Sequence, residues 1–307
     1  MESKDKNLII VLGPTSVGKS STAVKLAKKI GGEIINCDSM QVYKGFDIGT
    51  DKIPQEKRRE IPHHLLDVVS PSTQFTAADF VRLTLQAIKK IAKKEKFPLI
   101  VGGTGLYLKA LLDGLFPEGK RDPSIRKKLE KEAGEKGLES LREKLMKVDP
   151  AYCEKIGKHD RLRIIRALEV FYSTQIPLSE HFLKTKSFVE DFNSIKIGLK
   201  LERQELYRRI EKRVDKMFEK GIVIEVQNLL QEGVSEKSPP FRALGYKYVL
   251  KFLKKDISME DAIILTKRDT RHYAKRQMTW FRKIEGIKWF SPYEFPSILE
   301  YVQKSLI

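Results

Sequence analysis

The chain has 307 residues, of which 41% are hydrophobic and 33% are charged, so its composition is that of a folded globular protein and excludes a disordered one. The net charge of +18 favours a polyanionic partner such as nucleic acid, although a lysine-rich surface kept for solubility explains it equally well. Two cysteines exclude a disulfide framework and a four-cysteine zinc site, and no apolar run is long enough to span a bilayer. We therefore expect a cytoplasmic protein with no signal peptide and no membrane partner.

The first third of the chain alternates short apolar segments with amphipathic ones. The pattern predicts strands over 7–12, 33–37 and 99–101, and helices over 18–30 and 76–95. Strands that alternate with helices indicate a parallel sheet with helices on its faces, so we predict an α/β fold.

Near residue 120 the composition changes from alternating apolar and amphipathic segments to mainly charged, helical ones. The predicted elements beyond this residue are charged helices over 122–147 that Gly134 and Gly137 interrupt, a helix over 159–173, a loop over 174–194, a strand over 194–201 and a helix over 205–221. The simplest organisation is an α/β catalytic core of residues 1–119 and 191–307, with a helical C-terminal part. An all-helical insertion domain over 120–190 interrupts this core.

Residues 13–20 carry the strongest single motif, Gly13-Pro14-Thr15-Ser16-Val17-Gly18-Lys19-Ser20. It matches the phosphate-loop (P-loop) pattern G-x-x-x-x-G-K-[ST] and lies between a predicted strand and a predicted helix. The glycines let backbone amides converge on an anion, Lys19 adds a full charge, and the Ser20 hydroxyl can hold Mg²⁺. The motif predicts a site for a diphosphate or longer chain, and ATP, GTP and an organic diphosphate all satisfy it.

Two further segments follow predicted strands and are expected at the same edge of the sheet. Asp38 follows the second strand, where its carboxylate can act as a base, bind Mg²⁺ indirectly or simply cap the loop. Thr104, in the segment 102–105, follows the third strand, where a tight turn with an N-cap is the simpler interpretation. His63 and His64 lack suitably spaced partner ligands, so we interpret them as structural or gating residues.

A basic segment over 266–283 is more specific than the net charge. Basic and aromatic side chains alternate there at about helical spacing: Arg268, Arg271, His272, Tyr273, Lys275, Arg276, Trp280, Phe281 and Arg282. Arginine beside aromatic rings suits phosphate contact and base stacking. An amphipathic helix whose aromatic residues pack inward satisfies the same pattern.

Together these motifs resemble one family, the tRNA dimethylallyltransferases, in their bacterial form. The motifs run in order from about residue 8 to residue 289: GPTSVGKS, DSMQVYKGFDIGT, PHHLLD, FTAADF, GGTGLYLKALLDGL, RIIRALEV, RALGYK and RDTRHYAKRQMTWFRK. The resemblance implies that the P-loop binds dimethylallyl diphosphate rather than ATP, with Mg²⁺ as cofactor. It also implies transfer of the dimethylallyl group to the N6 amine of the adenine 3′-adjacent to the anticodon, with release of diphosphate. Where the family often has DIGTAKP, this chain has DIGTDKIP, which we interpret as an outer-loop difference.

The same resemblance implies roles for individual residues. Asp38 is the expected catalytic base with Thr104 beside it, and Arg209 and Arg213 are candidates for closing over the diphosphate. The expected tRNA-binding residues are Asp38, Ser39, Met40, Gln41, Thr104, Arg163, Arg166, Arg242, Gly245, Lys247, Lys275, Arg276 and Arg282. We expect the insertion to clamp the anticodon stem-loop, and the protein to be a monomer.

Two other functions stay open. A P-loop kinase, or an isopentenyltransferase acting on free adenine nucleotides, shares the P-loop and Asp38 but needs neither the basic segment nor the insertion. A nucleic-acid-binding ATPase or switch protein needs a strand ending in an aspartate that holds Mg²⁺. The third predicted strand ends in Gly102 and Gly103 instead, which disfavours this alternative.

Overall fold

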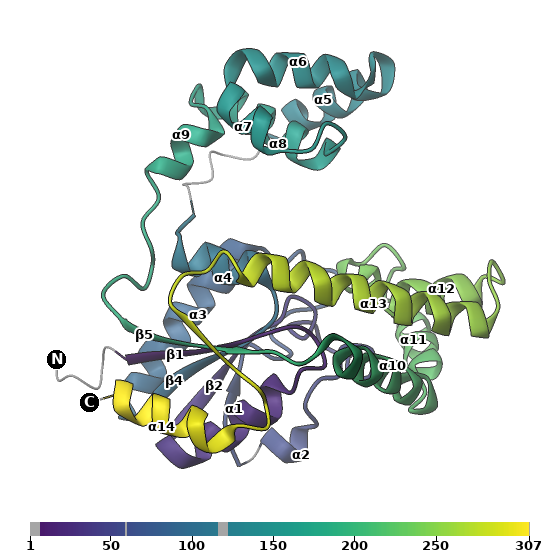
Figure 1. Cartoon of the computed structure of the whole chain (residues 1–307). Helices are drawn as coiled ribbons and strands as arrows, with labels where there is room; N and C mark the ends of the chain where they lie inside the picture. The colour runs from purple at the N-terminus through teal and green to yellow at the C-terminus, as the bar shows by residue number, and fades with distance from the viewer. Residues whose placement is uncertain (1–6, 59, 116–121, 307) are drawn as a thin grey trace. The chain divides into compact units, whose positions relative to one another are not determined.

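The structure, a computed structural model, describes residues 7–58, 60–115 and 122–306 (Figure 1). The chain divides into two compact units. The first contains the chain up to Ala110 and from Val189 onward, and the second contains Leu111–Phe188. The first boundary predicted for the insertion, at residue 120, lies outside the described residues. None of the helices in the described ranges is long and apolar enough to cross a lipid bilayer.

The first unit is built on a parallel sheet. Its strands within the described residues are β1 (Asn7–Leu12), β2 (Gly32–Cys37), β3 (His63–His64), β4 (Phe97–Gly102), β5 (Asn193–Leu199) and β6 (Ile287–Phe290). They lie in the order β3-β2-β4-β1-β5-β6, and every neighbouring pair is parallel. The predicted α/β fold is therefore confirmed.

Strand β1 lies in the interior of the sheet, between β4 and β5. Ile10 is in register with Ile100 of β4 on one side and with Lys196 of β5 on the other. The chain first builds the sheet to one side of β1 and later to the other side. The carboxyl end of β1 therefore lies at a reversal of strand order, where open α/β sheets bind their ligands.

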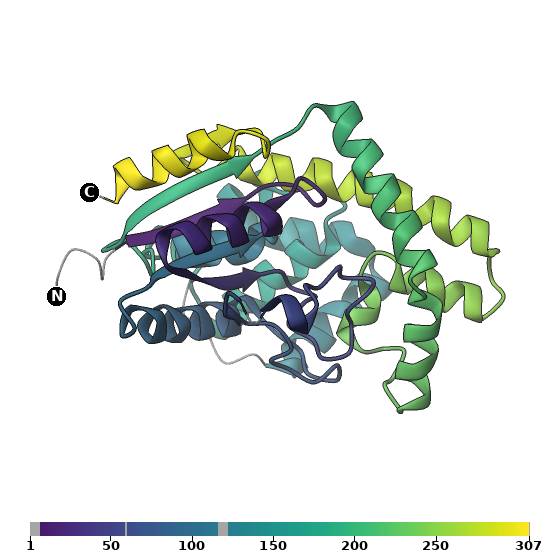
Figure 2. The ribbon, with the colours of Figure 1, turned by 90° about the horizontal axis from the view of Figure 1, so that it is seen from below.

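Helices cover both faces of this sheet. The helices that begin in the first unit are α1 (Lys19–Ile30), α2 (Gln55–Arg58), α3 (Ala77–Ala92), α4 (Gly105–Leu112), α10 (Arg203–Glu219), α11 (Ile222–Gln231), α12 (Tyr246–Leu253), α13 (Met259–Phe281) and α14 (Phe295–Ser305). Helices α1 and α14 lie on one face and α3 on the other (Figures 1 and 2). Side chains alternate between faces along a strand, so Ile9, Val11, Leu99 and Val101 share a buried cluster with α1 and α14.

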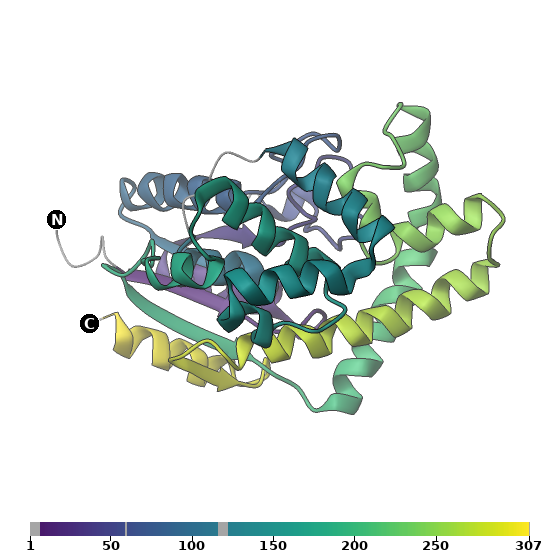
Figure 3. The ribbon, with the colours of Figure 1, turned by 90° about the horizontal axis from the view of Figure 1, so that it is seen from above.

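The helices α10 to α13 form a second layer of structure beyond the carboxyl ends of the strands (Figure 3). Here α12 and α13 are consecutive helices packed against each other, and α13 also packs against α10. A capping box at Ser258 and Asp261 starts α13, because each side chain accepts from the other residue's backbone amide. A separate apolar cluster joins α10, α11 and α12 to the loop after β2, with Phe46 against Tyr246 and Phe241.

The loop that follows β2 is organised around a buried lysine. Lys52 Nζ donates to Asp47 Oδ1 at 2.5 Å, to Asp67 Oδ1 at 2.6 Å and to the carbonyl oxygen of Tyr43 at 2.8 Å. Arg58 also binds the carboxylate of Asp67, at 2.7 Å. Burial opposes ionisation of Asp67, but the hydrogen bonds from Lys52 and Arg58 outweigh it and lower the pKa of that carboxyl. These hydrogen bonds and ion pairs of Lys52 and Arg58 therefore fix the conformation of the loop.

The second unit is helical in its described residues. Its further helices are α5 (Pro123–Glu135), α6 (Gly137–Val148), α7 (Pro150–Lys155), α8 (Arg161–Thr174) and α9 (Leu178–Leu183). They enclose their own apolar cluster, in which Leu141, Leu145, Ile164 and Leu168 are fully buried. This core is separate from that of the sheet.

The interruptions predicted at Gly134 and Gly137 were half right. Gly134 lies inside α5 and does not interrupt it, but the break predicted at Gly137 is present, and its φ of 80° favours glycine. Helix α9 occupies part of the segment predicted to be a loop, and Pro177 stands at its N-cap, where a proline is tolerated. Helix α7 was not predicted because six residues carry too little periodicity.

We predict that Lys52→Met destabilises the protein by about 1–3 kcal/mol, because Asp47 and Asp67 lose a buried cationic partner. Chemical denaturation measures the free energy of unfolding. Lys44→Met, at an exposed lysine of the same loop, is the matched control and should change that free energy by less than about 0.5 kcal/mol. Equal losses for the two variants would contradict the role given to Lys52.

Candidate active site

The segment between β1 and α1 has the geometry of a phosphate loop. Gly13 and Gly18 have positive φ values of 152° and 108°. A Cβ atom at Gly13 would lie 2.6 Å from the carbonyl oxygen of Leu199, so only glycine fits. Lys19 stands at the start of α1, and its Nζ donates to the carbonyl oxygen of Pro14 at 2.8 Å. The free amides at the helix N-terminus and this ammonium group together favour an anion.

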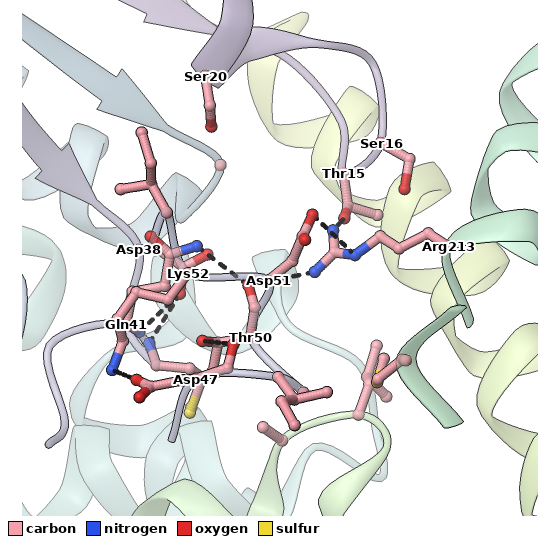
Figure 4. A pocket seen from close by; sticks show the side chains of 18 of the residues that line it. Thr15, Ser16, Ser20, Asp38, Gln41, Asp47, Thr50, Asp51, Lys52 and Arg213 are labelled. Atoms are coloured by element: carbon pink, nitrogen blue, oxygen red, sulfur yellow. Dashed lines mark hydrogen bonds and ion pairs between the residues drawn. The ribbon is translucent and has the colours of Figure 1, made fainter. Parts of the chain in front are cut away.

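The loops after β1, β2 and β4 open into one cavity of about 1630 Å³. Small-molecule sites usually occupy about 300–1,000 Å³, so this one has room for more than a single small ligand. Of the residues predicted from the sequence, those that line it are Thr15, Ser16, Gly18, Lys19, Ser20, Asp38, Ser39, Met40, Gln41, Arg209, Arg213, Arg242, Lys247 and Arg276. Figure 4 shows Ser20, Asp38 and Arg213 around this space.

Asp38 is positioned by its own loop. Its Oδ1 accepts hydrogen bonds from the backbone amides of Met40, at 2.8 Å, and Gln41, at 3.3 Å. Its Oδ2 has no hydrogen-bond partner in the described ranges. The hydroxyl of Thr104 accepts from the amide of Ser39 at 3.0 Å, which ties the loop after β4 to the loop after β2. One carboxylate oxygen is thus fixed and the other is free to accept a proton.

The electrostatics of Lys19 are set by its surroundings. Burial lowers its pKa to about 8; the carboxylate of Asp38 opposes this shift, and the guanidinium of Arg213 adds to it. An incoming anion compensates the desolvated ammonium and raises its pKa again. Binding of an anion and protonation of Lys19 are therefore coupled.

Arg209 and Arg213 both reach the P-loop from α10. Arg213 Nη1 donates to the Thr15 hydroxyl at 2.6 Å, and Arg209 Nη1 donates to the carbonyl oxygen of Val17 at 3.4 Å. Arg209 is further held by Glu205, at 2.9 Å, and by the hydroxyl of Tyr293, at 2.5 Å. These contacts place two guanidinium groups beside the loop that binds the anion.

Sequence reasoning missed Gln277, which is buried and connects two loops of the site. Its Oε1 accepts from the backbone amide of Thr15 at 2.8 Å, and its Nε2 donates to the carbonyl oxygen of Gly103 at 2.9 Å. The available signal was its position on α13, on the same helical face as the buried residues Ala274 and Phe281. An amide on an apolar face requires partners.

Tyr273 was predicted only as one of several aromatic residues, and it lines the cavity. Burial raises the pKa of its hydroxyl, the carboxylate of Asp38 adds to this, and Thr104 opposes it. Of the two interpretations given for Trp280 and Phe281, base stacking and inward packing, the structure favours inward packing. Phe281 is fully buried, and Trp280 packs so closely on Gly105 that a Cβ there would lie 2.8 Å from its ring.

Other predicted residues do not line the cavity. Gly245 is the N-cap of α12, has a φ of 93° and packs against Met217. Lys275 and Arg282 are exposed on the surface of α13. Those that complete the P-loop or support its neighbours from behind are Gly13, Pro14, Val17 and Thr104.

Two predicted arginines belong to the second unit. On α8, Arg163 pairs with Asp160 at 3.4 Å and Arg166 pairs with Glu169 at 3.1 Å. The two histidines of β3 are structural: His64 Nε2 contacts the buried Glu33 carboxylate at 2.8 Å, and His63 Nδ1 contacts the carbonyl oxygen of Ile61 at 2.6 Å.

The chain is similar to known proteins over nearly its whole length. A family profile described as "IPP transferase" matches residues 41–284. A relative from Geotalea uraniireducens, "tRNA dimethylallyltransferase 2", is 47% identical over 98% of both chains. A "tRNA dimethylallyltransferase" from Carboxydothermus hydrogenoformans is 48% identical over 93% of this chain and 92% of its own length.

Solved structures agree with these relatives. A tRNA isopentenylpyrophosphate transferase from Bacillus halodurans is 37% identical, with a TM-score of 0.73, covering 98% of this chain and 97% of that chain. A eukaryotic dimethylallyltransferase acting on tRNA is 30% identical, with a TM-score of 0.83, covering 97% of this chain and 77% of that chain.

We predict that affinity for inorganic diphosphate falls as pH rises above about 8, by up to about tenfold per unit. Below this value Lys19 carries its proton before binding, whereas above it the proton must be taken up. Calorimetric titrations across pH 7–10 in buffers of different ionisation enthalpy measure both effects. Lys19→Arg stays charged throughout and should lose the part of the pH dependence that Lys19 contributes; an unchanged profile in this variant would refute the assignment.

We predict that Gln277→Ala weakens diphosphate binding about 5- to 20-fold, because the Thr15 amide loses its partner and the P-loop loses its tie to Gly103. Gln277→Glu keeps the acceptor for Thr15 but places a carboxylate against the Gly103 carbonyl, so its loss should be as large or larger. Thr279→Ala, at an exposed position on the same helix, is the control. Diphosphate affinity unaffected by Gln277→Ala would refute the role.

Proposed function

The chain belongs to the IPP transferase family, that of the tRNA dimethylallyltransferases, and from this premise we propose that it prenylates tRNA. The reaction moves a dimethylallyl group from dimethylallyl diphosphate to the N6 amine of the adenine 3′-adjacent to the anticodon. The observation that carries the proposal is the cavity shared by Lys19 of the P-loop and Asp38 after β2. The transfer needs a site that stabilises the leaving diphosphate and a base within one reaction centre; Lys19 serves the first need and Asp38 the second.

The P-loop side of the cavity suits the diphosphate of the donor. Lys19 and the amides at the start of α1 offer positive charge, and Arg213 and Arg209 add two guanidinium groups. The Ser16 hydroxyl is buried and lacks a hydrogen-bond partner among the residues described. A buried donor of this kind is stabilised when a phosphate oxygen reaches it. Fixed donors that face the leaving group stabilise the charge that develops on it.

The residues present also fit Mg²⁺. Within the described ranges there is no group of three or more His, Cys, Asp or Glu side chains that could form a protein cage for a metal. Mg²⁺ bound to phosphates needs few protein ligands, and the Ser20 hydroxyl lines the cavity beside the P-loop. When bound, Mg²⁺ would neutralise part of the diphosphate charge.

Asp38 is the proposed base. The N6 lone pair forms a bond to the allylic carbon that carries the diphosphate, and the carbon–oxygen bond breaks with its electron pair leaving on the diphosphate. One N–H proton passes to Oδ2 of Asp38, the oxygen that the loop amides leave free. An exocyclic aryl amine is a weak nucleophile, so removal of this proton aids the step.

The rest of the cavity suits an RNA nucleotide taken out of its stack. Ser39 and Gln41 offer polar side chains, and Met40 an apolar one, that can contact an unstacked base in place of its lost partners, with Thr104 holding this segment in place. Arg242, Lys247 and Arg276 line the same space and add positive charge for backbone phosphates. Lys247 is kept in position by Asp269, at 2.8 Å.

The alternatives are less well supported. The relatives over nearly the full length are named for tRNA, which favours tRNA over a free adenine nucleotide as acceptor. An ATPase of the switch type needs a carboxylate at the end of the strand beside β1. Strand β4, one of the two neighbours of β1, ends at Gly102 and is followed by Gly103, so it offers no such carboxylate.

The direct test is incubation of the protein with dimethylallyl diphosphate, Mg²⁺ and unmodified tRNA, followed by mass spectrometry of the digested nucleosides. We expect adenosine to gain one five-carbon unit. Asp38→Asn keeps the loop hydrogen bonds but cannot accept the proton, so we expect transfer to fall about 10²- to 10⁴-fold with RNA affinity changed less than about threefold.

Asp256→Asn, an exposed position, controls for the loss of a carboxylate. Absence of any prenylated adenosine with the unaltered protein would overturn the proposed function. Full transfer by Asp38→Asn would overturn the assignment of the base alone.

A further inference from the structure

Arg213 is held from three directions at the mouth of the P-loop. Besides the Thr15 hydroxyl, its Nη2 donates to the carbonyl oxygen of Thr50 at 3.2 Å, and its Nε lies 3.4 Å from Oδ2 of Asp51. Figure 4 shows the guanidinium lying between Asp51 and Thr15. Asp51 is the one anionic partner of Arg213 within the described residues.

Asp51 is the residue that departs from the family pattern quoted above, where alanine is frequent. The interpretation of this departure as an outer-loop difference was wrong, because Asp51 lines the cavity. A carboxylate there carries the same sign of charge as a diphosphate and faces the same guanidinium. Two anions that share one cation compete for it.

The backbone of Asp51 is held by its neighbours, whereas its side chain is largely exposed to solvent. The buried residues Thr50 and Lys52 flank it, and its amide donates to the carbonyl oxygen of Ile48 at 3.1 Å. Its φ of 55° lies in the left-handed region, and these anchored neighbours hold it there. The carboxylate itself is 60% exposed. A partly hydrated ion pair of this kind is weak and exchangeable.

We propose that Asp51 is an internal anionic partner of Arg213 that the donor diphosphate displaces. In the free protein the carboxylate keeps the guanidinium directed at Thr15. On binding, phosphate oxygens take over Arg213, and the Asp51 carboxylate turns to solvent. Asp51 is thus a positioning residue that lowers affinity for diphosphate and eases its release after transfer. The inference rests on the proposed diphosphate site of the P-loop.

The test is calorimetric titration of inorganic diphosphate into the full chain at low salt, with and without Mg²⁺. We expect Asp51→Asn and Asp51→Ala to tighten binding about two- to fivefold, an effect that shrinks at high salt. In an Arg213→Met background the same substitutions should leave affinity unchanged, since the competition needs the arginine. A merely structural role would weaken binding instead.

Asp215→Asn is the matched control, because Asp215 lies on the same helix as Arg213 but pairs with Lys267 outside the cavity. It removes the same charge and should leave affinity unchanged. Tightening by Asp215→Asn equal to that of Asp51→Asn, or tightening that persists without Arg213, would overturn the proposal. So would loss of the Mg²⁺ dependence in Asp51→Asn, which would identify Asp51 as a metal ligand.

These outcomes are separable from the function proposed above. If diphosphate binds as expected but no adenosine is prenylated, the inference about Asp51 stands and the function falls. If transfer occurs and Asp51→Asn binds diphosphate no tighter, only the inference falls. Failure of the unaltered protein to bind diphosphate would remove the premise of both.

Discussion

A buried amide side chain holds together the two loops that define the reaction centre. Gln277 satisfies a part-buried backbone amide of the P-loop and a buried backbone carbonyl of the loop after β4, and without it each of these groups would lose the partner that the structure gives it. The parallel sheet brings the strand ends into the same region, but it does not fix the spacing between the loops. That spacing depends on α13, which lies outside the sheet and carries the side-chain amide of Gln277. The position of Asp38 follows, because Thr104 in the second of these loops binds the segment after Asp38.

Charge is arranged around the cavity so that cations are present but partly compensated. Lys19 is desolvated, Arg209 is paired with Glu205, and Arg213 is shared between neutral oxygens and Asp51. Each of these cationic hydrogen-bond donors is therefore kept in position before an anion binds, and its charge remains available to that anion. A few positioned cations of the cavity can contact an anion directly. The rest of the net charge of +18 can attract a polyanion over a longer distance.

Features encoded by local patterns could be predicted from the sequence, and features that depend on distant contacts could not. The strand 7–12, the P-loop and the helix after it were predicted because apolar runs, glycines and periodicity are local signals. Gln277 meets Thr15 across 262 positions, and no local pattern records such a contact. The burial of Lys52 was missed because charged residues in a loop are normally exposed. The ion pair of Asp51 with Arg213 was missed because it joins distant positions of the chain. The role of Trp280 stayed open because an aromatic residue packed on a glycine and one available for stacking look alike in sequence.

The late position of α13 has a consequence for biosynthesis. Strands β1, β2 and β4 and the P-loop are all encoded before residue 105, so the sheet edge that carries them can begin to assemble while the ribosome is still translating the rest. The glutamine that completes the loops emerges only near the end of translation. A nascent or prematurely terminated chain that lacks α13 therefore has the P-loop without the amide side chain that ties it to Gly103, and we expect it to bind a diphosphate weakly.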